Sequence, residues 1–196
     1  MRTVNTKAGK YIRVISLFVF CNQRIYGNCC FYKGAYLCVA DSLLQEYYGD
    51  KAESLKACSA NGAYLGNFSQ LPFCLFENRI GEMIYECFAE AQITPWAYIT
   101  STYSQISTAI CFERLAAAFI PHVCLAEQRQ EIPKDINIFP LLHNGQPLMQ
   151  HVNLIRLRDR YLPRPARYFQ DLLSGYLRTI EQVRLERIVT GEKKTV

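Results

Sequence analysis

The fold of this chain is decided by residues 68–122, which read FSQLPFCLFENRIGEMIYECFAEAQITPWAYITSTYSQISTAICFERLAAAFIPH. Short apolar runs alternate here with amphipathic segments that begin with polar residues. We expect strands at residues 71–76, 95–100 and 116–120, with a helix after each of the first two. This order is typical of an α/β fold with a parallel sheet, whose helix N-termini face a crevice suited to a small anionic ligand.

Polar caps and apolar periodicity predict the two helices of this stretch. Asn78 is expected to cap the first helix. Apolar side chains then recur at helical spacing, at Ile80, Met83, Ile84, Cys87, Phe88 and Ala91. Thr102 and Gln105 have the spacing of a capping box and are expected to open the second helix.

Upstream of this stretch, two further strands are predicted at residues 11–20 and 30–40, the second with a bulge at Gly34. Asp41 or Ser42 is expected to cap a short helix. Residues 49–70 show no firm periodicity and are predicted to be a long connection.

Downstream, strands are predicted at residues 136–141 and 150–157, with a tight turn at Asn144 and Gly145 between them. Pro163 and Pro165 precede a last helix. Its apolar stripe consists of Phe169, Leu172, Leu173, Tyr176, Leu177, Ile180 and Val183.

Composition limits the classes of function. The chain has 196 residues, half of them apolar, which allows one domain or two small lobes. Residues 1–151 carry 12 basic and 12 acidic side chains. Residues 152–196 carry 10 basic and 5 acidic side chains, so the net charge of +5 lies in this C-terminal stretch. The charges of the last helix alternate in sign, which favours a solvated helix face over a surface for nucleic acid or membrane.

The nine cysteines show no C-x-x-C spacing, which leaves zinc and thioredoxin-like sites without their usual signature. Several lie within apolar patterns, as buried thiols do, and a reducing cytoplasmic compartment fits best. Residues 11–21 are too short to span a membrane, and no signal peptide is recognised.

Candidate ligand-binding residues lie at the two helix starts. Asn78 and Arg79 either bind an anion, with a bidentate contact from Arg79, or form a plain cap beside a solvated arginine. Ser101, Thr102 and Tyr103, with the hydroxyl of Ser104 beside them, are polar beyond what a cap requires and favour ligand binding.

Structural roles are favoured for the three histidines, although His122 follows a predicted strand end. A catalytic pair of Cys124 and His122 rests on sequence proximity alone and is disfavoured. The sequence has no phosphate-binding loop, G-x-G-x-x-G motif or metal-ligand spacing, so we expect no cofactor and no metal.

Several pieces in this order resemble the effector-binding region of LysR-type transcriptional regulators. The resemblance covers about residues 31–176. It is carried by YLCVADSLL (36–44), LPF (71–73), ITP (93–95), TSTYS (100–104), AAAFIP (116–121) and IRLRDRYLPRPARYFQDLL (155–173).

The resemblance implies a periplasmic-binding-protein-like (type 2) fold of two lobes, with a mixed, mostly parallel sheet in the lobe present and the other lobe incomplete. A small effector binds between the lobes in that family. The matching cleft positions are Glu77, Asn78, Arg79, Ser101, Thr102 and Tyr103, and we add His122.

The chain also departs from the family pattern. No winged helix-turn-helix precedes the first predicted strand, and Arg114 and Ala116 replace expected glycines. We therefore predict a truncated regulator. Its expected parts are a remnant of the first lobe (1–29), the second lobe (30–154), a returning strand and helix of the first lobe (155–180) and a tail (181–196).

The expected function is that of a cytoplasmic effector-sensing domain and not of an enzyme. The expected ligand is a small organic anion or an amino-acid-like effector. The alternatives are a free-standing solute-binding protein of the same fold and, less favoured, an α/β enzyme. We expect no sequence-selective DNA binding by this chain alone and no membrane contact, and we expect the last helix to promote association, which leaves a homo-oligomer open.

Overall fold

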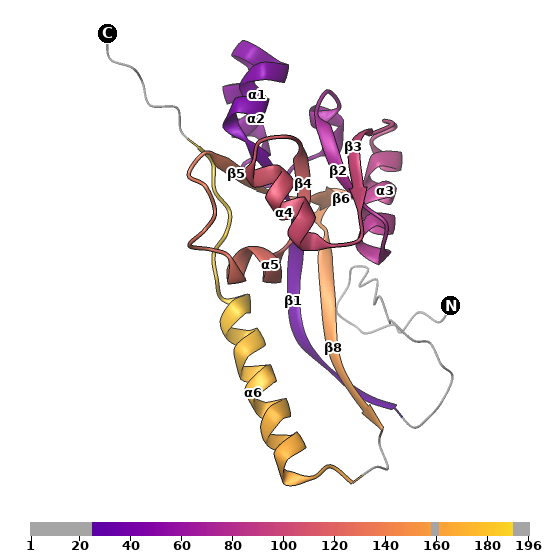
Figure 1. Ribbon diagram of the computed structural model, residues 1–196. Helices are drawn as coiled ribbons and strands as arrows, with labels where there is room; N and C mark the ends of the chain where they lie inside the picture. The colour runs from indigo at the N-terminus through magenta and orange to yellow at the C-terminus, as the bar shows by residue number, and fades with distance from the viewer. Residues whose placement is uncertain (1–24, 158–160, 190–196) are drawn as a thin grey trace.

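A computed structural model describes residues 25–157 and 161–189 as a mixed α/β structure (Figure 1). Its strands are β1 (Ile25–Ala40), β2 (Pro72–Phe76), β3 (Trp96–Ser101), β4 (Ala117–Pro121), β5 (Ile136–Pro140), β6 (Leu142–His143), β7 (Gln146–Pro147) and β8 (Met149–Leu157). Its α-helices are α1 (Asp41–Tyr48), α2 (Ala52–Ser59), α3 (Arg79–Glu90), α4 (Ser104–Phe112), α5 (His122–Glu127) and α6 (Arg164–Glu181). Two short 3-10 helices are η1 (Gly49–Lys51) and η2 (Leu65–Phe68).

The main sheet has the strand order β3-β2-β4-β1-β5, and β8 pairs with β1. Strand β2 is parallel to β3 and β4, whereas β1 is antiparallel to β4, β5 and β8. The other strands of this sheet therefore share one direction, and β1 alone runs in the opposite direction. This arrangement confirms the prediction of a mixed, mostly parallel sheet.

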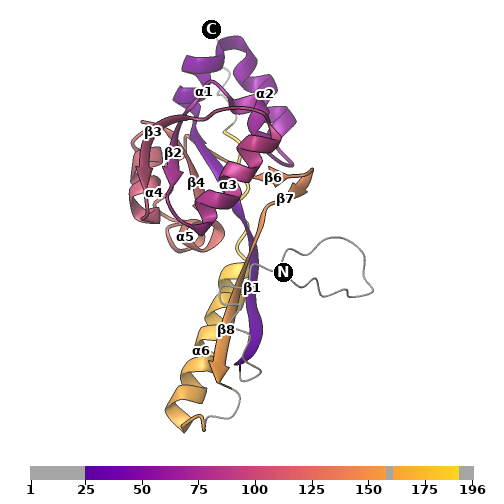
Figure 2. The ribbon, with the colours of Figure 1, turned by 90° about the vertical axis from the view of Figure 1, so that its right-hand side faces the viewer.

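Strand β1 belongs to two parts of the molecule. Its C-terminal residues pair with β4 and β5 in the main sheet. Its N-terminal residues pair with β8 from Ile25 to Gly34 and form a two-stranded ribbon. Figure 2 shows this ribbon leaving the main sheet alongside α6. We call the main sheet with α1 to α5 the head.

The head is built around aromatic side chains. Phe73, Phe88 and Phe119 have at most 1% of their surface exposed. Their ring centroids lie 5.1 to 5.7 Å apart, and Phe73 stacks on Phe119. They come from β2, α3 and β4, so the predicted stripe of α3 packs onto the predicted strands. Burial of such rings is a main source of stability in a core.

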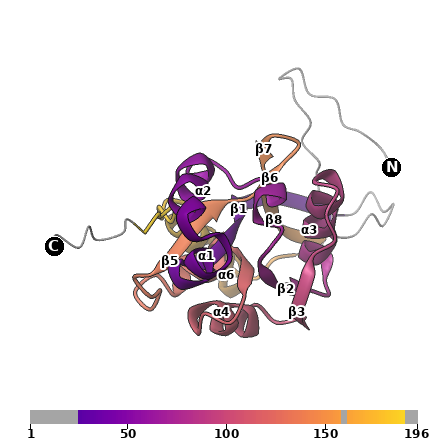
Figure 3. The ribbon, with the colours of Figure 1, turned by 90° about the horizontal axis from the view of Figure 1, so that it is seen from above.

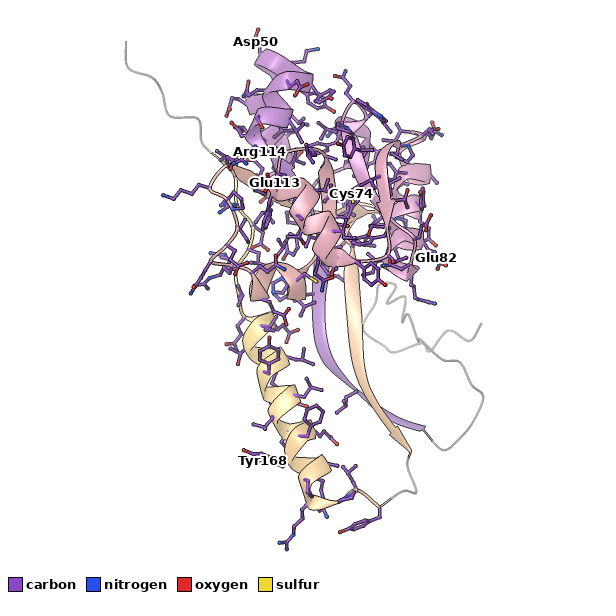
Figure 4. The ribbon with its side chains drawn as sticks, in the orientation of Figure 1. Asp50, Cys74, Glu82, Glu113, Arg114 and Tyr168 are labelled. Carbon is purple, nitrogen blue, oxygen red and sulfur yellow. The ribbon has the colours of Figure 1, made fainter. Side chains whose placement is uncertain are left out.

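Helix α6 is less covered than the head. Four apolar side chains on it are at least half exposed: Tyr168, Phe169, Leu172 and Tyr176. Figure 4 shows Tyr168 on the part of α6 that lies far from the main sheet. The predicted stripe is thus present but only partly covered, since Ile180 is buried whereas Phe169 and Leu172 are exposed, and association through it stays a prediction.

Residues 182–189, which we call the strap, return from α6 to the head. The backbones of Arg187 and Ile138 exchange hydrogen bonds of 2.7 and 3.2 Å at the edge of β5. The amide of Val189 donates to Asn137 Oδ1 at 2.7 Å, and its carbonyl accepts from Lys56 Nζ at 2.8 Å. The strap therefore fixes the end of α6 to the head.

Four local predictions are wrong. Residues 49–70 contain η1, α2 and η2 and are not an unstructured connection. The irregularity of β1 lies between Cys29 and Phe31, not at Gly34. Neither Asp41 nor Ser42 caps α1, since Ala40 is its N-cap residue. Thr102 is not a cap either, since α4 begins at Ser104 after Tyr103.

Other predictions hold or are untested. Asn144 and Gly145 have positive φ angles of 50° and 68° in the turn between β6 and β7, as the Asn-Gly pair predicts. The strand predicted at residues 11–20 lies outside the described residues. The proposed lobe boundaries stay predictions. Among the described helices, none has the length and hydropathy needed to cross a membrane.

Candidate functional site

The carboxyl ends of the parallel strands β2, β3 and β4 meet at one edge of the head. Helices α3 and α4 follow β2 and β3, two neighbouring strands. Figure 3, which looks down on the head, shows α3 and α4 on opposite faces of the sheet. Neighbouring strands whose helices take opposite faces leave a crevice between their carboxyl ends, and this is where ligands bind in such sheets.

Asn78 joins the segments that follow β2 and β3. Its Oδ1 accepts hydrogen bonds from the amides of Ile80 at 2.9 Å and Gly81 at 3.1 Å, which confirms the predicted cap of α3. Its Nδ2 donates to the carbonyl of Thr102 at 3.4 Å, and the Glu77 amide donates to the Ser101 carbonyl at 3.2 Å. The segments after β2 and β3 are therefore held against each other.

The start of α4 differs from that of α3, because no side chain caps it. Ser101 is 8% exposed, and its Oγ accepts from the amide of Tyr103 at 3.1 Å, which shapes the turn before the helix. Thr102 and Tyr103 are exposed. The first amides of α4 thus carry the positive end of the helix dipole without a side-chain acceptor at the cap position, a setting that favours an anion.

Charged and apolar groups flank these helix starts. Glu77 and Arg79 are both exposed. A shallow apolar hollow lies beside the start of α3 and the ribbon, lined by Ala35, Ile80, Met83, Leu148 and Met149. A guanidinium, hydroxyls and helix amides next to an apolar surface suit a small anion with a hydrocarbon part.

His122 follows β4 at this edge, but its ring contacts other parts of the protein than the six other candidate residues. Its ring is 1% exposed. Its Nε2 lies 3.0 Å from the carbonyl oxygen of Ile180, and its Nδ1 lies 3.2 Å from the hydroxyl of Tyr36. Burial lowers the pKa of His122 below its ordinary value, so the neutral ring is favoured. Both nitrogens have protein partners, and this placement does not support an effector contact.

The thiols of the head behave as small apolar groups. Cys38, Cys74, Cys87 and Cys111 are buried free cysteines. Burial raises the pKa of Cys74, and it raises the pKa of Cys87 and of Cys111 to about 12, which keeps both protonated. Burial also raises the pKa of Cys124. These thiols are therefore poor nucleophiles.

Metal binding finds no support in the described part of the chain, where no three His, Cys, Asp or Glu side chains are arranged to hold an ion. His143 instead contacts Glu90, with Nδ1 3.1 Å from Oε2. This contact holds the short β6–β7 hairpin against α3.

Sequence reasoning missed the ion pair of a buried lysine beside the strap. Lys56 is 1% exposed, and its Nζ donates to Asp41 Oδ1 at 2.8 Å. Asn137, also fully buried, bonds to the carbonyl of Val39 and to the strap. No signal in the sequence indicates these contacts, because the partners come from distant segments.

Arg114 marks a departure from the regulator pattern that the sequence resemblance revealed. It occupies a left-handed conformation, with φ of 62°, which favours the glycine expected at this place. Its guanidinium pairs with Asp135 through two hydrogen bonds of 2.6 and 2.9 Å. Figure 4 shows Glu113 and Arg114 on the upper side of the head. They follow the C-terminal end of α4, so Arg114 takes no part in the crevice.

Neither a protein-family model nor a curated protein sequence matches this chain. Many solved structures do. The effector binding domain of QuiR in complex with shikimate has a TM-score of 0.55 at 13% identity and covers 83% of this chain and 69% of that chain. The regulatory domain of CcmR from Synechocystis PCC6803 in complex with 2-PG has a TM-score of 0.57 at 8% identity. That match covers 79% of this chain and 67% of the CcmR domain.

The LysR family transcriptional regulator CbnR has a TM-score of 0.52 at 14% identity, and the match covers 76% of this chain but 47% of that regulator. The chain thus spans about half the length of that structure. At these identities the likeness establishes the fold. The described chain has the type 2 periplasmic-binding-protein-like fold of LysR effector-binding domains.

Proposed function

We propose that this chain is the effector-sensing part of a LysR-type transcriptional regulator, a binding domain and not an enzyme. One observation carries the proposal. The fold is shared with the QuiR effector binding domain over 83% of this chain, and within it we place the site between β2 and β3, where Asn78 links the segments that precede α3 and α4. A fold alone does not determine function, so the chemistry of the crevice must agree with it.

The effector is a small organic anion. The uncapped start of α4 and the guanidinium of Arg79 supply positive potential, and Ser101, Thr102 and Tyr103 supply hydrogen-bonding groups. Glu77, which is exposed and precedes Asn78 in the sequence, disfavours anions of high charge by repulsion. The shikimate and 2-PG bound in the structural relatives support a ligand of this size.

The proposal also divides the chain into the two lobes of such a domain. Residues 30–154 form the second lobe, residues 1–29 and 155–180 belong to the first, and residues 181–196 form the tail. The free thiols of the described cysteines support a cytoplasmic location, where thiols stay reduced.

Calorimetric titration with shikimate, 2-PG and a panel of small carboxylates and phosphates tests the proposal. We expect at least one ligand to bind, and Arg79→Ala to weaken it about tenfold or more through loss of a charged hydrogen bond. Arg129→Ala, at an exposed arginine after α5, is the matched control and should bind as the wild type does. Equal affinity in the wild type and Arg79→Ala would place the ligand elsewhere, and no binding across the panel would remove support for the function.

A further inference from the structure

His122 connects three segments that are distant in sequence. It begins α5 directly after β4, and its ring touches Tyr36 of β1 and the carbonyl of Ile180 at the end of α6. The hydroxyl of Tyr36 also lies 3.4 Å from Oε1 of Glu186 in the strap. A row of hydrogen-bonding groups therefore connects α6, through His122 and Tyr36, to the strap.

The donor and the acceptor of each of these hydrogen bonds follow from the chemistry of the atoms. The Ile180 carbonyl only accepts, so Nε2 of His122 carries a hydrogen and donates it. In the neutral ring Nδ1 then accepts, and the donor is the Tyr36 hydroxyl at 3.2 Å. That hydroxyl has one hydrogen, so it donates either to Nδ1 of His122 or, at 3.4 Å, to Oε1 of Glu186, and with a neutral ring the shorter contact is the one to His122.

We propose that Tyr36, His122 and Glu186 form a proton-controlled clasp that ties the end of α6 and the strap to the head. When Nδ1 of His122 takes a proton from water, it becomes a donor and the Tyr36 oxygen accepts from it. The Tyr36 hydrogen then turns to the carboxylate of Glu186. Apart from this proton, which leaves hydronium and binds Nδ1, no covalent bond changes, and the added positive charge is linked to a negative one through hydrogen bonds.

The charges around the ring set where this switch operates. Burial is the largest influence on the pKa of His122 and lowers it, and the Ile180 carbonyl opposes this by accepting from the ring. Lys33 of β1 lowers the pKa further, whereas Glu186 of the strap and Glu181 of α6 raise it. The neutral arrangement therefore persists to a pH below the ordinary histidine value of about 6.5.

The consequence for stability has a definite sign. A histidine whose pKa is lower in the folded state stabilises the fold fully above its unfolded pKa. That stability is lost as the pH falls from about 6.5 toward the folded value. Because α6 reaches the head mainly through α5 and β1, its last turn and the strap should respond first. The clasp does not depend on effector binding.

Nitrogen NMR of the His122 ring in the full chain provides the test. We expect the Nε2–H tautomer at neutral pH and a pKa below that of an exposed histidine. Glu186→Gln should lower that pKa further, because a negative charge near the ring is removed, whereas Glu131→Gln, at an exposed glutamate after α5, should leave it unchanged.

Hydrogen exchange supplies the second measurement. As the pH falls below about 6, protection factors at the end of α6 and in the strap should decrease in the wild type, because protonation of His122 lowers the stability. In His122→Gln, whose amide still donates to the Ile180 carbonyl but does not titrate, they should stay constant, while His143→Gln should behave as the wild type. An Nδ1–H tautomer at neutral pH, or a His122 pKa that Glu186→Gln does not change, would overturn the clasp.

Discussion

Replacing Gly81 by alanine tests how closely α3 approaches the end of β2. A Cβ atom built on Gly81 lies 2.0 Å from the carbonyl oxygen of Phe76 and 2.7 Å from its carbonyl carbon. These are backbone atoms, so no side chain can rotate away to make room. The first turn of α3 would have to move from β2 by about 1 Å or more, in a core packed as densely as a crystal.

Two opposing contributions set the size of the effect. Overpacking of this kind costs about 1–3 kcal/mol, or more where backbone must shift. The better helix propensity of alanine offsets up to about 1 kcal/mol of this loss in the free energy of unfolding. We therefore expect a net loss of about 1–2 kcal/mol in the free energy of unfolding, which lowers the melting temperature by several degrees in a chain of this size.

Gly175 is the matched control, because it is also a helical glycine and a Cβ there meets nothing within 4 Å. Gly175→Ala should stabilise the protein by about 0.5–1 kcal/mol. Urea and thermal unfolding followed by circular dichroism compare both variants with the wild type. The two substitutions should have opposite signs. A Gly81→Ala variant as stable as Gly175→Ala would refute the close contact between α3 and β2.

Three further outcomes are expected from the described contacts. Asn78→Ala should lose about 1 kcal/mol of stability with the cap of α3, whereas Thr102→Val, which removes no cap, should unfold at the same urea concentration as the wild type. Arg114→Gly should be more stable than Arg114→Ala in the same assay, because both lose the pair with the carboxylate but only glycine relieves the left-handed conformation. Iodoacetamide should label exposed Cys58 in the native protein and buried Cys111 only in urea, as mass spectrometry would show; rapid native labelling of Cys111 would contradict the described core.

Local signals in the sequence predicted the parts of the fold that depend on local interactions. Asn78 and the apolar spacing after it predicted α3 because a cap and a buried stripe are both properties of one helix. The capping-box spacing of Thr102 and Gln105 failed because Ser101 and Tyr103 form the turn before α4, which begins at Ser104. A capping pair with correct spacing is therefore weaker evidence than a cap followed by a buried stripe.

Non-local contacts explain what the sequence did not reveal. Helix α2 was missed because Lys56 makes its buried face look polar, although the charge is paired with Asp41, 15 residues away. His122 was expected at the crevice, yet its partners Tyr36 and Ile180 lie 86 and 58 residues away. A strand-end histidine points toward a ligand or into the protein according to partners that only the three-dimensional structure identifies.

Amide chemical-shift mapping during titration with the anion panel tests the central claim most directly. Binding between β2 and β3 should shift the amides at the start of α3, from Asn78 to Gly81, together with those at the start of α4, from Thr102 to Gln105. The amides in the middle of α6 should stay unchanged. Shifts confined to α6 or to the strap, or no shift at either helix start with any panel member at millimolar concentration, would contradict an effector site at this edge of the sheet.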